Sequence, residues 1–199
     1  CGLAYCDTKD IFYMSNTHSD IITVLDNKFS AIDKLEFSNK SGNERNSFHH
    51  INDLTAHNGN LFVSYFSKSG NWRYNIYDGG AAIWDENKRK FHEIISNLYM
   101  PHSPMVFDGK FHICDSSRGR FYVGTSEIKT EFPGFLRGLD YNGEYYILGL
   151  SETMYYSRLM GANKNIMLNA GIILYDSEKN ISRIYPLLDL ANIHQVMFV

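Results

Sequence analysis

The chain has 199 residues, with 22 acidic and 19 basic side chains and a formal net charge of −3. This balance argues against nucleic-acid binding and against an anionic membrane surface, because both need a concentrated basic face. The length suits one all-β domain, and 14 Tyr and 13 Phe beside only 4 Pro favour strands.

The cysteine spacing and the hydropathy of the sequence limit where in the cell the protein is expected. Cys1, Cys6 and Cys114 cannot all pair within the chain, and their spacing matches no zinc pattern. Reduced thiols are typical of a reducing compartment, so we expect a cytoplasmic location. No apolar run approaches the roughly 18 residues of a membrane span, so none is predicted.

Repeats organise the sequence. Four phrases each pass a turn residue and reach a serine eight positions later: Asp7 to Ser15, Gly59 to Ser67, Gly109 to Ser117 and Gly143 to Ser151. Asn-Gly or Asp-Gly between apolar runs is a strong hairpin signal. Each phrase therefore predicts an inner strand, a hairpin and a second strand.

Two further strands follow each phrase. The third strands are predicted at 20–26, 80–86, 119–125 and 170–176, and the fourth at 31–37, 90–96, 127–133 and 181–187. Four strands per repeat is typical of a β-propeller blade. We therefore predict a single all-β domain, a β-propeller of four-stranded antiparallel blades, at residues 1–47, 48–97, 98–134 and 135–190.

The ends of the sequence predict a portion of a longer chain. Cys1 aligns with a position inside a strand, and residues 191–199 match the start of a further blade. Two insertions interrupt the repeats, at 68–79 and at 152–169, and the second is expected to hold a short helix. Insertions at corresponding hairpins fall on one face of such a fold.

Polar residues on the inner strands are the candidate site, because inner strands of a propeller line its channel. The predicted ligand-binding residues are Asn52, Asp53, His102, Ser103, Arg137 and His194. Counting from the turns places Asp53, Ser103 and Arg137 at one equivalent position. These residues either tie neighbouring blades together, since buried polar groups need partners, or bind a ligand. Arg137 would then suit a carboxylate or phosphate.

A metal site is the weaker alternative. His50, His102 and His194 could supply nitrogen ligands, but no local spacing of the HxxxH kind supports them, so no metal is predicted. No motif identifies a cofactor or a catalytic residue. Of the two tryptophans, Trp72 lies in the first insertion and could stack on a sugar ring, whereas Trp84 is expected in the core between blades.

Several motifs resemble one family: Asn-Asp-Leu (52–54), Pro-His-Ser-Pro (101–104) and Pro-Gly-Phe-x-Arg-Gly-Leu (133–139). They are similar to those of an uncharacterised bacterial family of propeller-like proteins, a domain of unknown function, over roughly residues 48 to 199. Met105 and His194-Gln195 depart from the family pattern. The resemblance implies a propeller and no activity.

The leading functional prediction is a module that binds a small molecule or saccharide at the mouth of the channel. The alternatives are a propeller hydrolase, lactonase or lyase, with or without a metal, and a platform for protein interactions. The sequence leaves open whether the protein is an enzyme.

Overall fold

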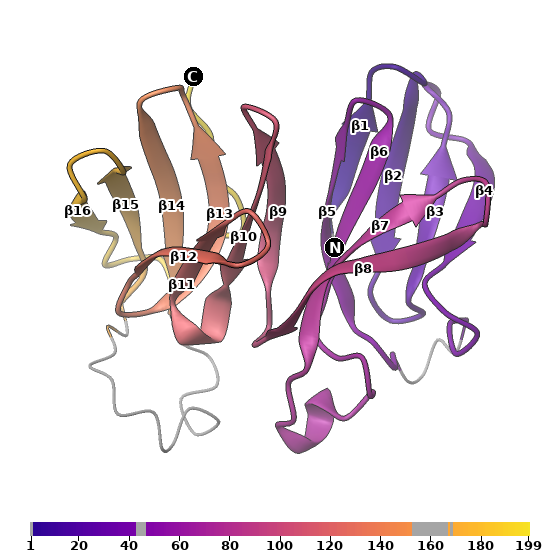
Figure 1. Ribbon diagram of the computed structural model, residues 1–199, viewed down its shortest axis with the longest axis horizontal. Helices are drawn as coiled ribbons and strands as arrows, with labels where there is room; N and C mark the ends of the chain where they lie inside the picture. The colour runs from indigo at the N-terminus through magenta and orange to yellow at the C-terminus, as the bar shows by residue number, and fades with distance from the viewer. Residues whose placement is uncertain (1, 43–46, 153–166, 168) are drawn as a thin grey trace. The chain divides into compact units, whose positions relative to one another are not determined.

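The computed structural model describes residues 2–42, 47–152, 167 and 169–199 (Figure 1). The chain divides into two compact units, 1–106 and 107–199. The helix expected within 152–169 falls on residues that lie largely outside this description.

The first unit holds two four-stranded antiparallel sheets whose strands follow one another in sequence order. The first sheet contains β1 (Leu3–Cys6), β2 (Ile11–Asn16), β3 (Ile21–Leu25) and β4 (Ala31–Glu36). The second contains β5 (Ile51–His57), β6 (Asn60–Tyr65), β7 (Gly79–Asp85) and β8 (Lys90–Leu98). A short 3₁₀ turn, η1 (Trp72–Tyr74), lies in the insertion, which extends beyond the ends of β6 and β7 (Figure 1).

Two more sheets follow, and the boundary between the units falls within the first strand of the third sheet. That sheet contains β9 (His102–Phe107), β10 (Lys110–Asp115), β11 (Arg120–Val123) and β12 (Glu127–Glu131), with η2 (Ser116–Arg118) after β10. The fourth contains β13 (Phe135–Tyr141), β14 (Tyr145–Ser151), β15 (Gly171–Asp176) and β16 (Ile181–Pro186). Four such sheets in series confirm the all-β prediction and the four-stranded blades of a β-propeller.

The core of the first unit joins its two sheets. Alternate residues of the strands are buried, as in Ile22 and Val24 of β3 and in Leu61, Val63 and Tyr65 of β6. This period of two is what a sheet with one packed face requires. In the second unit Phe121 and Tyr146 pack edge to face with ring centroids 5.0 Å apart.

The predicted hairpins form, with loops of two lengths. Asn58-Gly59 and Asp108-Gly109 have positive φ at both residues, the conformation of tight primed turns. The β1–β2 and β13–β14 connections are longer, because the pairs Cys6↔Ile11 and Tyr141↔Tyr146 each leave four residues between them.

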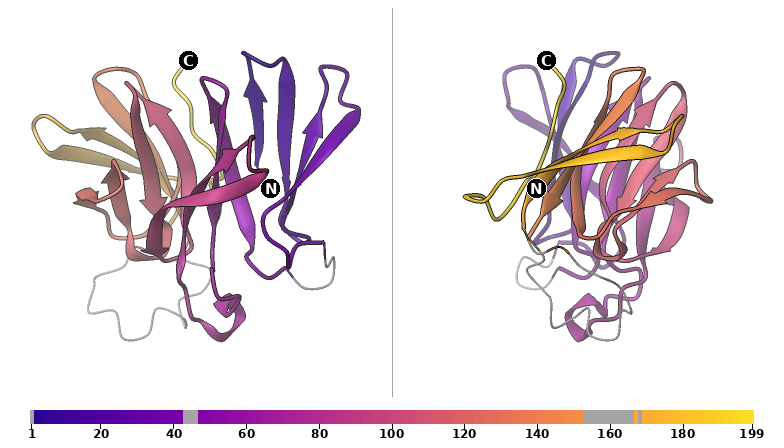
Figure 2. Two further views of the ribbon diagram at one scale, coloured as in Figure 1. Left: turned by 45° about the vertical axis from the view of Figure 1, so that its right-hand side comes forward. Right: turned by 90° about the vertical axis from the view of Figure 1, so that its left-hand side faces the viewer.

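Two repeat serines tie the second strand of their blade to the part of the chain that follows the blade. The buried Ser15 hydroxyl donates to the Asn52 carbonyl at 2.6 Å and accepts from the Gly2 amide at 2.6 Å. Ser151 does the same in the second unit, where it donates to the Ile193 carbonyl at 2.9 Å. Residues 191–199 form no strand, although they run irregularly beside their own unit (yellow in Figure 2), and the Phe198 amide donates to Asp140.

A buried carboxylate fixes the connection between the first two blades. Asp20, 1% exposed at the β2–β3 turn, accepts hydrogen bonds from the amides of Phe48, His49 and Ile51 at 2.6, 2.8 and 3.1 Å. It also accepts from the Ser47 hydroxyl at 2.9 Å. A buried carboxylate with this many donors is stable without a cation partner, so residues 47–51 are held by Asp20.

We expect Asp20→Asn to lower the free energy of unfolding by about 3 kcal/mol, because an amide nitrogen would face backbone N–H donors that need an acceptor. Chemical denaturation of the purified variant measures this. Asp26→Asn is the matched control, since Asp26 accepts from Lys28 and Ser30 amides in an exposed turn. Equal losses in the two variants would contradict the assignment.

Candidate functional site

The predicted inner-strand residues lie in two β-bulges. Asn52 and Asp53 of β5 stand opposite the single residue Ser64, between the pairs Ile51↔Tyr65 and Leu54↔Val63. Arg137 and Gly138 of β13 stand opposite Gly149 in the same way. Bulges redirect side chains and are common beside functional sites.

The strand register corrects the expected equivalence of Asp53 and Arg137. The longer β13–β14 loop shifts the count by one residue, so Arg137 is level with Asn52 in the repeat, and Gly138 is level with Asp53. The turn residues alone do not show how long the loop is, so the sequence could not predict this shift of one residue.

Within the first unit the structure joins Asp53 to Ser103. The Ser103 amide donates to the Asp53 carboxylate at 3.0 Å, and Ser103 has a positive φ of 54°. His102, 2% exposed, donates through Nδ1 to the Met100 carbonyl at 2.9 Å. Asn52 is also buried. The first contact ties β9 to β5, whereas the bond of His102 is local to the start of β9. The ligand-binding role of these residues stays a prediction.

The other two predicted residues, Arg137 and His194, lie in the second unit. Arg137 is half-buried in β13, and His194 is exposed in the segment after β16. Because they belong to a different unit, they are described by their own surroundings only. Gly138 beside Arg137 leaves space for the chain, since a Cβ there would lie 2.9 Å from the Val196 amide.

A cluster of rings forms around His50 in the first unit, and we call it the His50 cluster: His50, Phe66, Trp72 and His102. The His50 imidazole stacks on Phe66 with ring centroids 4.4 Å apart and contacts Trp72 at 4.5 Å. Phe66 also meets His102 edge to face at 5.3 Å. His50 and His102, two of the histidines considered as metal ligands, thus both contact the Phe66 ring.

The insertion is folded back to complete the His50 cluster. The indole nitrogen of Trp72 donates to the Ser47 carbonyl at 3.2 Å. Asp78 anchors the other end by accepting from the Ser67 hydroxyl and the Lys68 amide, at 2.6 and 2.9 Å. The guanidinium of the exposed Arg73 lies 5.0 Å from the Trp72 ring. The sequence left open whether Trp72 stacks on a sugar or anchors its loop, and it did not predict the contact with His50.

The backbone of His50 is held in an unusual conformation. His50 has a positive φ of 54°, which is uncommon for a residue other than glycine. Its amide donates to the Ser47 hydroxyl at 2.9 Å, and its carbonyl accepts from the Phe66 amide at 3.3 Å. The Asp20 carboxylate holds the residues on either side, so the ring is aimed by the backbone.

The His50 ring is uncharged at neutral pH. Burial against the aromatic rings lowers its pKa to about 4, although the nearby Asp20 carboxylate opposes the shift. Neither ring nitrogen has a hydrogen-bond partner among the residues that the structure describes. A neutral imidazole offers one donor and one acceptor, so His50 can bind a polar group that is not part of the protein.

Two other histidines serve as structural contrasts. His49 donates through Nδ1 to the Ser67 carbonyl at 2.9 Å, so its Nε2 accepts from the Ser38 hydroxyl at 2.7 Å. Burial lowers its pKa. In the second unit His112 donates to the Lys110 carbonyl and contacts the Tyr146 hydroxyl, and burial lowers its pKa to about 4. Both rings are fully engaged within their own units.

Neither a metal cluster nor a membrane helix is found in the described ranges. No three side chains of His, Cys, Asp or Glu there are placed to hold a metal ion together. Likewise, the described residues contain no helix long and apolar enough to cross a membrane. Cys6 and Cys114 are buried free thiols.

The comparisons with known proteins agree with an all-β fold of propeller blades. The model of a domain of unknown function (DUF4915) matches residues 3–185, so the chain belongs to this family. The family model thus also covers residues 3–47, whereas the resemblance seen in the sequence motifs begins only near residue 48. No curated protein matches the chain.

Solved structures are similar at low identity. A hydrazine synthase from Kuenenia stuttgartiensis is 12% identical with a TM-score of 0.52, over 96% of this chain and 55% of that one. A luciferin-regenerating enzyme is 10% identical with a TM-score of 0.54, over 99% and 78%. The β-propeller domain of the Trilobed protease from Pyrococcus furiosus is 14% identical with a TM-score of 0.48, over 94% and 56%. The chain thus spans about half the length of the hydrazine synthase chain, and the likeness to the first two concerns the fold alone.

The lowered pKa of His50 predicts a loss of stability in mild acid. Its folded pKa, about 4, lies below the value of about 6.5 in the unfolded chain, so the unfolded state binds the proton more readily between these values. Stability is full above pH 6.5 and falls as the pH drops to 4, by up to about 3 kcal/mol from this residue. The free energy of unfolding, measured by chemical denaturation at several pH values in this range, should change less with pH for His50→Gln than for the wild type. Superimposable pH profiles would contradict the assignment.

Proposed function

We propose that this protein is a binding module for a small polar molecule, such as a saccharide, with its site at the His50 cluster. The observation that carries the proposal is the neutral His50 imidazole, whose two ring nitrogens have no partner in the described part of the chain. The ring nitrogens of the partly exposed His50 are not among the buried polar atoms that lack a partner in the described residues. They are therefore accessible, and a ligand can bond to them in place of water.

The surroundings of His50 support a ligand with both polar and apolar surface. Phe66 and Trp72 offer aromatic surface, while the imidazole offers a donor and an acceptor. Ligand sites generally combine apolar walls with a few placed polar groups. The insertion that carries Trp72 is a loop on a rigid sheet, which is where binding residues commonly occur.

The predicted residues of the channel complete this proposal as supporting groups. Asp53 and Ser103 are tied to each other, and His102 contacts Phe66. We propose that Asn52, Asp53 and His102 position the inner strands behind the cluster. The ligand-binding role of Arg137 and His194, which belong to the second unit, remains a separate prediction.

The chain has two tryptophans, so Trp84→Phe leaves Trp72 as the single fluorescent reporter of this site. We expect at least one of D-glucose, D-galactose, D-glucuronate and N-acetyl-D-glucosamine to change Trp72 emission in a saturable way. Adding His50→Gln should weaken that response about tenfold, because one or two hydrogen bonds are lost. His112→Gln is the matched control and should bind normally. A response that survives His50→Gln, or none with any probe, would overturn the proposal.

A hydrolase or lactonase is the second candidate, favoured by the same imidazole. A neutral histidine beside aromatic rings can accept a proton at neutral pH, and shifted pKa values gather at active sites. Hydrolysis of D-glucono-δ-lactone should then show a rate that falls with a midpoint near pH 4 and is abolished in His50→Gln. A rate equal to the uncatalysed one excludes this candidate for that lactone and leaves the binding proposal standing.

A further inference from the structure

A groove of about 590 Å³ lies in the first unit between three hairpins. The β1–β2 turn contributes Lys9, the β5–β6 hairpin contributes Gly59 and Asn60, and the β7–β8 hairpin contributes residues 83–88. Its volume is within the range of about 300–1,000 Å³ that small-molecule sites occupy. None of its lining residues belongs to the His50 cluster.

Trp84 is the aromatic residue in the wall of this groove. It is half-buried, and it packs against the core that joins the first two sheets, as the sequence predicts. Its ring packs against Phe91, its partner across the strands, with centroids 4.9 Å apart. Arg89 lies 5.9 Å from the same ring and is held by Asp33 at 3.1 Å. The indole is thereby fixed in place before any ligand arrives.

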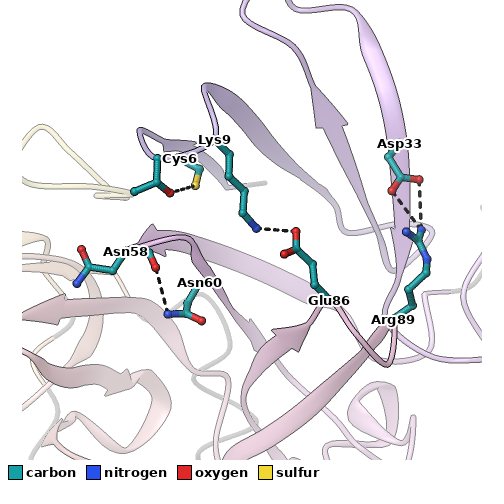
Figure 3. A network of polar contacts seen from close by, with 8 residues as sticks. Cys6, Lys9, Asp33, Asn58, Asn60, Glu86 and Arg89 are labelled. Carbon is teal, nitrogen blue, oxygen red and sulfur yellow. Dashed lines mark hydrogen bonds and ion pairs between the residues drawn. The ribbon is translucent and has the colours of Figure 1, made fainter.

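The charged groups of the groove are paired with one another. Lys9 and Glu86 reach toward each other from different sheets and meet at 2.6 Å (Figure 3). Asp85 contacts both Lys88 and His92, at 3.4 and 3.2 Å. Because positive and negative groups alternate, the groove offers many donors and acceptors and no concentrated field of one sign.

The β1–β2 and β5–β6 turns, which form one rim of the groove, lie close together. A Cβ on Gly59 would lie 3.3 Å from the Thr8 hydroxyl, and Gly59 itself has a positive φ of 77°. The Asn60 amide group bonds to the Asn58 carbonyl at 3.4 Å, as Figure 3 shows. The rim is therefore formed by short, ordered hairpins, and the groove does not depend on the insertion.

We propose that this groove is a second binding site, for an uncharged sugar ring. The ring would lie with its C–H face against Trp84, and its hydroxyls would bond to the Lys9–Glu86 pair and to Asn60. A fixed aromatic side chain supplies contact area at little entropic cost. Paired charges favour a neutral polyhydroxylated ligand over an ion, since an ion would have to displace one partner of a pair. The site is independent of the function proposed above.

Trp72→Phe leaves Trp84 as the only tryptophan, which makes the groove directly observable. The protein is titrated with D-glucose, D-galactose, D-mannose, D-xylose, N-acetyl-D-glucosamine, cellobiose and maltose. We expect a saturable change in Trp84 emission with at least one of them, and none with sorbitol, which has no ring. In the same background Glu86→Gln should weaken binding about fivefold by removing a charged acceptor.

Glu131→Gln is the matched control for Glu86→Gln. Glu131 pairs with Arg120 at 2.6 Å, the same distance as in the Lys9–Glu86 pair, but outside the groove and in the other unit. This variant should bind as tightly as its parent. Circular dichroism checks that each variant is folded.

Three results would overturn the proposal. The first is no change in Trp84 emission with any sugar of the panel. The second is a change that Glu86→Gln and Glu131→Gln reduce equally, since a specific contact would then be absent. The third is a saturable response in the protein that keeps only Trp72 and none in the protein that keeps only Trp84. That last result would support the His50 cluster, so the two proposals fail separately.

Discussion

The first unit depends on one buried carboxylate. Asp20 accepts hydrogen bonds from three backbone amides and one hydroxyl of residues 47–51. In an apolar interior such a charge is tolerable only because four donors replace its water. The same bonds set the path of the chain into β5. They therefore fix the left-handed backbone of His50, and through it the direction of the imidazole.

The repeat serines show how one repeated position can take different tasks. Ser15 joins β2 to the inner strand of the next blade, and Ser151 joins β14 to the irregular segment after β16. Ser67 is the serine of the second repeat, and its hydroxyl donates to Asp78 instead. That bond closes the base of the insertion that carries Trp72. In the second blade the repeat serine therefore stabilises the insertion. Bonds from Asp20 and His49 hold the segment that leads into β5 instead.

The fold could be read from the sequence because its signals are local. Alternating apolar residues and turn residues placed the third and fourth strands of each blade within two residues of their observed bounds. The site was harder, because it depends on contacts between segments far apart in the chain. The sequence did not predict that Trp72 contacts His50, or that Trp84, beside its place against the core, also lines a groove with Lys9 from another sheet. Loop length also moved Arg137 by one position in the repeat.

The two candidate sites reach electrical neutrality by opposite physical routes. His50 is neutral because burial removes its proton, whereas Lys9 and Glu86 remain ionised and cancel each other. The first route ties binding to pH, since protonation of His50 would convert an acceptor into a donor. The second route ties binding to the geometry of two adjacent blades, since the pair exists only while both turns stay in place.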